Sequence, residues 1–235
     1  MLVLASASPR RRELLTQAGF SFVVHPAHIP EDPLPDEDPI AYVTRLAREK
    51  AQFVYDEIQA NPTLCMSLSE GLTRETKKAH ASLPRASAAP QVPQVLGAPG
   101  PVSGPCETTT FDRQSLAVLG ADTTVFFDHH ILGKPENAAD AARMLHLLSG
   151  RTHQVATGIA LVSAHCAQAV AEVTTVEFLP LTDAEIDAYI ATGEPMDKAG
   201  AYAIQGRAAR WIPRIEGCYF NVVGLPIARV TTLLK

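Results

Sequence analysis

The sequence predicts an α/β fold in which a mixed, twisted sheet is flanked by helices. Short apolar runs typical of buried strands alternate with segments of helical periodicity, and helix-start signals recur between them. Two apolar runs in the C-terminal half are placed to form a hairpin, which makes the sheet mixed. With 235 residues, 46% hydrophobic and 19% charged, the chain can bury a substantial core in one domain or two lobes.

The N-terminal segment predicts a strand followed by a helix. Leu2–Leu4 is the apolar run, Ser8 stands at the helix N-cap, Pro9 at the first helical position, and Gly19 is placed to end the helix. Arginines 10–12 then fall in the first turn, where the helix dipole is already positive. A bound anion such as phosphate would offset this charge. The alternative is a solvated basic face.

A second strand and a second helix are predicted next. Residues 20–25 form the apolar run, and Asp38 with Pro39 repeats the helix-start signal. Lys50 lies at the edge of the apolar face of this helix, where a lysine either covers the core with its stem or reaches into a site.

The composition changes sharply between residues 61 and 115. This stretch is rich in Pro and Ala and shows little periodicity, so we expect a partly disordered insertion within a single domain, 1–235. A loop of this length is unusual inside a compact domain, which predicts either an appendage or a lid.

The elements predicted after the insertion are each bounded by turn or capping residues. They are a strand at 117–127, a helix from Asn137 to Gly150, a hairpin of strands 153–163 and 169–179, and a helix opened by the capping box Thr182–Glu185 and reaching Gly193.

Charge and composition exclude several classes of protein. A net charge of −5 argues against coating of nucleic acid but leaves room for a local basic pocket. No apolar run approaches the roughly 20 residues of a membrane span. Four widely separated cysteines indicate neither a zinc site nor a disulfide framework. We therefore expect a cytoplasmic protein that binds neither nucleic acid nor a membrane. The cysteines are Cys65, Cys106, Cys166 and Cys218.

Charged residues gather in loops at the ends of the predicted elements. Asp122 instead falls in the middle of a predicted strand, where Asp is disfavoured and is either functional or merely structural. Together the charged residues and one amide suit a polyphosphate with a divalent metal. The set comprises Asp122, Glu194, Asp197, Arg10, Arg11, Lys50, Lys134, Lys198 and Gln205.

Seven short motifs follow one another along the chain: Ser6-Ala-Ser-Pro-Arg-Arg11, Leu46-Ala-Arg-Glu-Lys-Ala51, Gly120-Ala-Asp-Thr123, Gly133-Lys-Pro135, Ser149-Gly-Arg-Thr-His-Gln-Val155, Gly193-Glu-Pro-Met-Asp-Lys-Ala-Gly-Ala-Tyr202 and Val222-Val-Gly-Leu-Pro226. Their order is that of the Maf family of nucleoside triphosphate pyrophosphatases. The chain resembles this family from Leu2 to about Leu234, outside the insertion, and resembles its dTTP/UTP branch through Arg10, Thr123 and Gln205.

The resemblance implies a compact two-lobed fold with a central cleft, similar to that of inosine triphosphate pyrophosphatases, and a homodimer. It implies cleavage between the α- and β-phosphates with a divalent cation, Mg²⁺ or Mn²⁺. We expect Asp122 to be the proton acceptor and Lys50 and Lys134 to be catalytic cations. The expected phosphate ligands are Ser8, Arg10, Arg11 and Lys198; the specificity residues are Arg10, Thr123 and Gln205; the metal ligands are Glu31 and Asp122, with Asp32 nearby.

Two alternatives remain open at this point. One is a non-catalytic nucleotide-binding regulator, for instance of cell division, and the other is a pyrophosphatase with purine specificity. A protein that only binds phosphates needs no carboxylate facing the anion, so the role of Asp122 separates the first alternative from the enzyme.

Overall fold

We describe the protein from a computed structural model, in which residues 1–80 and 115–235 are described. A mixed sheet with the strand order β2-β1-β3-β5-β6-β7 forms the centre, and β4 pairs with the far end of β3. β1 is parallel to β2 and β3, whereas all other neighbours are antiparallel. The strands are β1 (Leu2–Leu4), β2 (Val23–Val24), β3 (Ala117–Phe127), β4 (His130–Leu132), β5 (Thr152–Ser163), β6 (Ala167–Glu177) and β7 (Arg214–Glu216).

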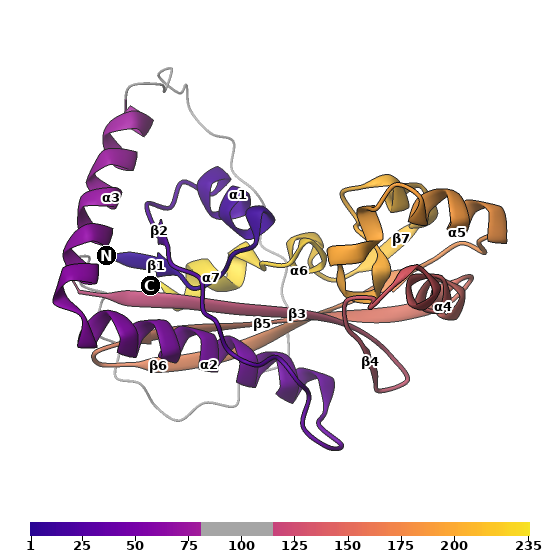
Figure 1. Cartoon of the computed structure of the whole chain (residues 1–235), viewed down its shortest axis with the longest axis horizontal. Helices are drawn as coiled ribbons and strands as arrows, with labels where there is room; N and C mark the ends of the chain where they lie inside the picture. The colour runs from indigo at the N-terminus through magenta and orange to yellow at the C-terminus, as the bar shows by residue number, and fades with distance from the viewer. Residues whose placement is uncertain (81–114) are drawn as a thin grey trace, which may run out of the picture.

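The helices group around two lobes that share the long strands β3, β5 and β6 (Figure 1). α2 lies along one face of the sheet, and α1, α6 and α7 lie on the other; α4, α5 and β7 build the right-hand lobe. The helices are α1 (Pro9–Gln17), α2 (Pro39–Ala60), α3 (Pro62–His80), α4 (Ala138–Leu148), α5 (Asp183–Ile190), α6 (Tyr219–Val223) and α7 (Ile227–Leu233). Three 3-10 helices precede β7: η1 (Glu194–Asp197), η2 (Ala199–Ala201) and η3 (Arg207–Trp211).

Capping residues set the helix ends, as the sequence predicts. The Asp38 side chain accepts hydrogen bonds from the amides of Ile40 and Ala41, and Thr182 with Glu185 forms a full capping box. Gly19 has a φ of +78°, the left-handed conformation expected after a helix end. Ser8 does occupy the N-cap of α1, but its hydroxyl makes no capping hydrogen bond.

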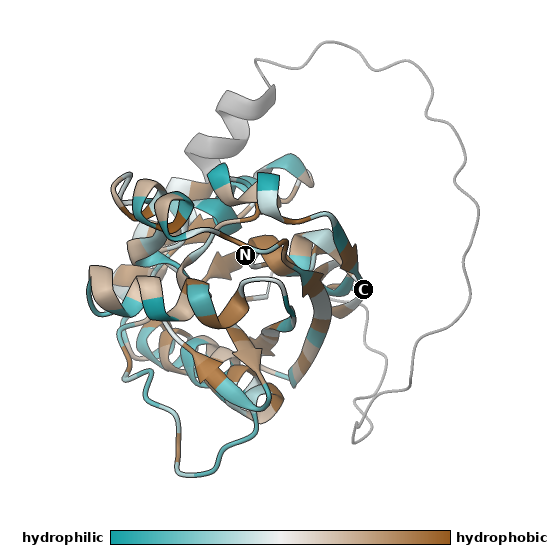
Figure 2. Cartoon of the chain, turned by 90° about the vertical axis from the view of Figure 1, so that its right-hand side faces the viewer, coloured by the Kyte–Doolittle hydropathy of each residue, from teal (hydrophilic) through white to brown (hydrophobic). Residues whose placement is uncertain are grey.

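Two glycines let α2 approach the sheet closely. A Cβ on Gly120 of β3 would lie 2.1 Å from the carbonyl oxygen of Ala47, and one on Gly158 of β5 would lie 2.1 Å from that of Val43. Only glycine fits at these two positions. Because the helix lies so close, the side chain of Lys50 can reach the central strand. In Figure 2 the strands are largely brown, while the helices carry teal on part of their surface, so their apolar faces cover the sheet.

The first part of the expected insertion, 61–115, is helical and packs against the core. Residues 62–80 form helix α3, and Leu64, Leu68 and Leu72 pack against the core formed by β1, β2 and α2. Their four-residue spacing is a helical signal, since it places all three on one face. The rest of the predicted insertion, 81–114, lies outside the described residues.

Smaller differences concern strand ends. Only Val23–Val24 of the predicted strand 20–25 joins the sheet, and the second hairpin strand runs over 167–177 instead of 169–179.

Within residues 1–80 and 115–235, no helix is both long and apolar enough to cross a membrane.

Candidate active site

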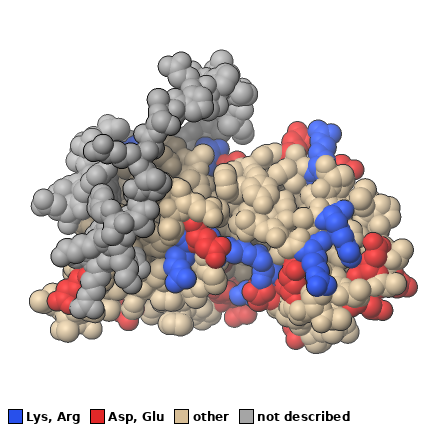
Figure 3. All heavy atoms as spheres, turned by 90° about the horizontal axis from the view of Figure 1, so that it is seen from above, with Lys and Arg blue, Asp and Glu red and all other residues tan. Residues whose placement is uncertain are grey.

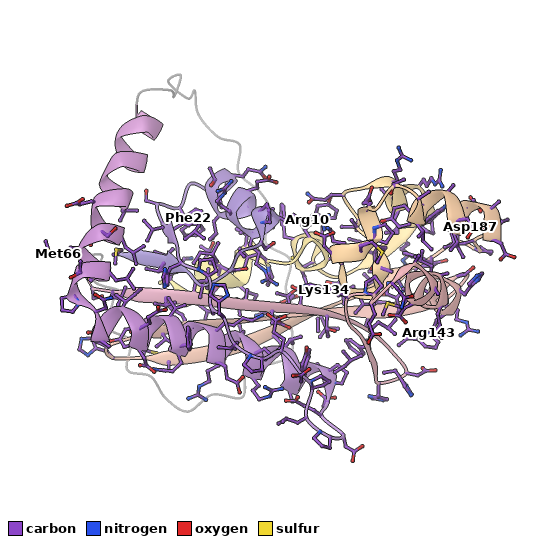
Figure 4. The ribbon with its side chains drawn as sticks, in the orientation of Figure 1. Arg10, Phe22, Met66, Lys134, Arg143 and Asp187 are labelled. Atoms are coloured by element: carbon purple, nitrogen blue, oxygen red, sulfur yellow. The ribbon has the colours of Figure 1, made fainter. Side chains whose placement is uncertain are left out.

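The site lies where one edge of β3 is left open. β3 pairs with β1 through residues 117–119 and with β4 through residues 125–127, so neither strand covers residues 120–124 on that edge. The loop before α1, the loop before α2 and the segment after β4 surround this opening. Figure 4 shows Arg10 of α1 and Lys134 after β4 in the middle of the molecule, between the lobes, whereas Arg143 and Asp187 lie on the right-hand lobe away from it.

Asp122 is the buried carboxylate at this opening. It is 7% exposed and faces α2, and its Oδ1 accepts a hydrogen bond of 2.7 Å from Nζ of Lys50. Burial raises the pKa of Asp122, against the opposing charges of Lys50 and Arg11. A carboxylate with a raised pKa is better suited to accept a proton near neutral pH than an ordinary surface aspartate.

Lys50 connects Asp122 to a second carboxylate. Its Nζ lies 2.5 Å from Oε1 of Glu31, and Lys50 itself is only 6% exposed. The Tyr42 hydroxyl donates a 2.7 Å hydrogen bond to the backbone carbonyl of Glu31, which fixes the loop that carries this residue. Burial alone would raise the pKa of Glu31, but the hydrogen bond and charge of Lys50, together with the charge of Lys134, lower it.

The two carboxylates also fit a divalent cation held jointly with a substrate. Glu31 and Asp122 both contact the same ammonium group, so their oxygens converge on one position that already accommodates a cation. Mg²⁺ commonly uses one or two carboxylates and takes its other ligands from phosphate and water. Among the described residues no cluster of three or more His, Cys, Asp or Glu side chains could hold a metal alone.

Arg11 lies on the opposite face of the sheet and is engaged in internal hydrogen bonds. Its Nε donates to the carbonyl of Gly224 at 2.8 Å, and its Nη1 donates to Ser6 Oγ at 3.0 Å and to the carbonyl of Ala121 at 2.9 Å. Its Nη2 donates to Thr123 Oγ1 at 2.9 Å. Arg11 therefore fastens α1 to the central strand, and a phosphate-binding role stays a prediction.

The other predicted cations are more exposed than Lys50. Arg10 at the start of α1 is partly buried, and Ser8 precedes it at the same helix end. Lys134 is exposed and lines an open depression of about 600 Å³ at the start of α4, with Asn137 among its neighbours. Lys198 is in contact with the carboxylate of its neighbour Asp197. Figure 3 shows basic and acidic side chains gathered in the middle of the face seen from above.

Two predicted specificity residues lie apart from Asp122. Thr123 points to the face opposite Asp122, because successive side chains of a strand alternate, and it contacts Arg11. Gln205 is exposed in the turn between η2 and η3. Glu194 does not join the charged cluster: its carboxylate accepts hydrogen bonds from the Tyr189 hydroxyl at 2.9 Å and from the amide of Arg207 at 3.1 Å.

Sequence reasoning missed several buried polar residues behind the site. Thr157 and Asn221 are both fully buried; Thr157 hydrogen bonds to Thr123 of β3, and Asn221 donates to the carbonyl of Val155 in β5. The available signal was a hydroxyl residue beside Gly158 within the otherwise apolar stretch 155–162 of β5. Which atom it would contact on α6 depends on the tertiary fold and could not be predicted.

The site combines a buried carboxylate–ammonium pair at a sheet edge with the N-terminus of α1, a helix that carries arginines. In an α/β protein, such a site is suited to binding phosphate groups. The family model described as Maf-like protein matches residues 1–235, and the chain belongs to this family. It is 42% identical over 234 residues to a "dTTP/UTP pyrophosphatase" of Koribacter versatilis, covering 100% of this chain and 93% of the relative.

Two further relatives carry the same name. The protein of Agathobacter rectalis is 40% identical over 242 residues, with 100% of this chain and 96% of the relative covered. That of Bacillus pumilus is 38% identical over 234 residues, with 100% of this chain and 95% of the relative covered. The similarity to these proteins therefore extends over the full length of the chain.

Proposed function

We propose that this protein is a nucleoside triphosphate pyrophosphatase that hydrolyses dTTP and UTP to the monophosphate and pyrophosphate. The observation that carries the proposal is the buried Asp122 carboxylate, paired with Lys50 at the open edge of β3. Membership of the Maf family and the names of relatives about 40% identical over full length support the substrate assignment.

Asp122 acts as the proton acceptor in this proposal. Water attacks the α-phosphorus, a new P–O bond forms, and the bond from the α-phosphorus to the bridging oxygen breaks. The proton of the water passes to the Asp122 carboxylate, whose raised pKa favours this transfer. The electron pair of the broken bond leaves with pyrophosphate.

Cationic side chains around the opening stabilise the departing pyrophosphate. Lys50 lies against Asp122, the charge of Lys134 acts on Glu31, and the charges of Lys198 and Arg10 act on Asp197. The N-terminus of α1, with Ser8 at its N-cap, adds backbone amides and a positive dipole end. Charge that develops on the leaving oxygens would be offset by these groups.

A divalent cation belongs to the same proposal, with Glu31 and Asp122 as its protein ligands. When bound, the metal would neutralise phosphate charge during the reaction. Because Lys50 occupies the position between both carboxylates, its ammonium competes with the metal. At a pH high enough to ionise Asp122 in both proteins, we expect Lys50→Met to bind Mn²⁺ more tightly than wild type in the absence of nucleotide, measured by electron paramagnetic resonance. Weaker or unchanged Mn²⁺ binding would contradict this assignment of ligands.

The base pocket remains a proposal that rests on the family resemblance. The exposed Gln205 amide can both donate and accept, which matches the edge shared by uracil and thymine. A homodimeric state and a cytoplasmic location are proposed on the same basis.

Released pyrophosphate from a panel of dTTP, UTP, CTP, ATP and GTP, with Mg²⁺ or Mn²⁺, tests the function. We expect dTTP and UTP to have the highest kcat/KM, and Gln205→Glu to flatten the ranking more than it lowers the best rate. No hydrolysis of any nucleotide would favour a non-catalytic binder, and faster hydrolysis of purine nucleotides would contradict the proposed specificity.

A further inference from the structure

A directed chain of hydrogen bonds connects Arg11 to α6 across the sheet. The Thr157 hydroxyl donates to the backbone carbonyl of Asn221 at 3.0 Å, so its oxygen is free to accept from the Thr123 hydroxyl at 2.9 Å. The other acceptor within reach of the Thr123 hydroxyl, the carbonyl of Gly224, is farther away at 3.4 Å, so we assign the Thr123 proton to Thr157. Thr123 then accepts from Arg11 Nη2 at 2.9 Å. Each hydroxyl in the chain thus donates once and accepts once.

Strand pairing and further hydrogen bonds fix the middle of this hydrogen-bond chain and its Asn221 end. Thr123 and Thr157 are opposite each other in the β3–β5 register, on the face away from α2. The Asn221 amide nitrogen donates to the carbonyl of Val155 and to Thr174 Oγ1, both at 2.9 Å, which fixes the acceptor on α6.

Asn221 keeps a polar side chain in a place where it is not fully satisfied. It is 0% exposed, and its Oδ1 is buried without a hydrogen-bond partner in the part of the chain that the structure describes. A buried unpaired acceptor is destabilising, and this cost offsets part of what the two hydrogen bonds donated by Nδ2 contribute.

The turn after α6 completes the arrangement. Gly224 has a φ of +119°, and a Cβ there would lie 3.5 Å from Thr123 Oγ1 and 3.9 Å from Arg11 Nε. Its carbonyl accepts the Arg11 Nε hydrogen bond. The guanidinium is therefore clamped between the turn on one side and the hydroxyl chain on the other.

We propose that Thr157 and Asn221 are positioning residues for the nucleotide site, acting through the chain Asn221–Thr157–Thr123–Arg11 on the first turn of α1. Both residues are fully buried, so they can act on the site only through their neighbours. The chain fixes the orientation of Thr123 and Arg11, and Arg11 in turn holds the helix end that carries Arg10 and Ser8. This inference rests on the proposed hydrolysis of dTTP and UTP.

A matched pair of substitutions at Thr157 separates positioning from packing. Thr157→Val removes the hydroxyl at nearly constant volume and breaks the chain, whereas Thr157→Ser keeps the hydroxyl and removes a buried methyl group. Both variants are expected to lose some stability. Only Thr157→Val should lower kcat/KM for dTTP, by about tenfold to 100-fold, the size of effect that about 1 Å of misplacement can produce.

Thr124→Val serves as the control on the neighbouring position of β3. Thr124 is 2% exposed, but among residues 1–80 and 115–235 its hydroxyl contacts only the carbonyl of Val125, at 3.4 Å, and takes no part in the hydrogen-bond chain. We expect this variant to keep wild-type kcat/KM. Equal kcat/KM in Thr157→Val and Thr157→Ser would overturn the proposal.

A second measurement does not depend on the reaction. The Arg11 Nε–H signal, identified by its loss in Arg11→Lys, should exchange slowly with water in the wild type and in Thr157→Ser, and faster in Thr157→Val. If the wild type hydrolyses neither dTTP nor UTP, the proposed function fails, and this exchange rate alone then tests the hydrogen-bond chain from Asn221 to Arg11. Unchanged exchange in Thr157→Val would refute it. Thr123→Val, which breaks the adjacent link, replaces Thr157→Val if that variant does not fold.

Discussion

Replacing Lys50 by methionine would leave two carboxylates facing each other without the ammonium between them. Asp122 is 7% exposed, while the Glu31 side chain is about half exposed. Removing one partner of a fully buried ion pair costs roughly 3–5 kcal/mol. Because the Glu31 end is open to solvent, we expect the lower limit, a loss of about 3 kcal/mol in the free energy of unfolding at pH 7. For a chain of this size that corresponds to a fall in Tm of roughly 6–12 °C.

The pH dependence of this loss identifies its cause. Without Lys50 the pKa of Asp122 rises further above that of the unfolded chain, so the folded state holds a proton that the unfolded state releases. Stability is then greatest at acid pH and decreases as the pH rises through the folded-state pKa. Urea unfolding at pH 5 and pH 7 should show a smaller loss at pH 5.

Two variants serve as controls for Lys50→Met. The double variant Lys50→Met/Asp122→Asn should recover part of the stability at pH 7, because the buried charge is gone. Lys134→Met, at an exposed position, should unfold as wild type does. A Lys50→Met protein as stable as wild type at pH 7 would refute the assignment of Lys50 as the partner of a buried charge.

Three further outcomes are expected. Asp122→Asn should lower kcat by about 10²–10⁴-fold while the protein stays folded, as measured by pyrophosphate release and circular dichroism. Burial lowers the pKa of His153 to about 3. Since the unfolded histidine takes up its proton near pH 6.5, stability should fall below that pH by up to roughly 1.4 kcal/mol per pH unit, and His153→Phe should lack this contribution in urea unfolding. Replacing 81–114 by a linker should preserve folding and hydrolysis, whereas replacing 61–115 should lower Tm because it removes α3 from the core; equal Tm values would contradict this packing.

Local signals were enough to predict most of the elements. Asp38, Asn137 and the Thr182–Glu185 capping box mark helix starts through contacts within four residues, so the sequence contains the whole cause. Helix α3 was missed because the unusual composition of the longer stretch around it obscured a short apolar face.

The site could be predicted only as a set of residues, and its geometry could not. Lys50 reaches Asp122 because glycines let α2 lie against β3 and β5, a contact between segments more than 70 residues apart. Thr123 follows Asp122 directly, yet strand alternation sends it to the other face and into contact with Arg11. Such partners follow from the tertiary fold and leave no periodic signal in the chain.

The fate of the attacking oxygen tests the central claim most directly. Hydrolysis of dTTP in water enriched in heavy oxygen, followed by mass spectrometry of the products, reports which phosphorus the water attacks. If water activated by Asp122 attacks the α-phosphorus, the heavy oxygen appears in dTMP and the pyrophosphate contains none. Heavy oxygen in pyrophosphate or in inorganic phosphate formed directly from dTTP, or unchanged labelling rates in Asp122→Asn, would contradict the account.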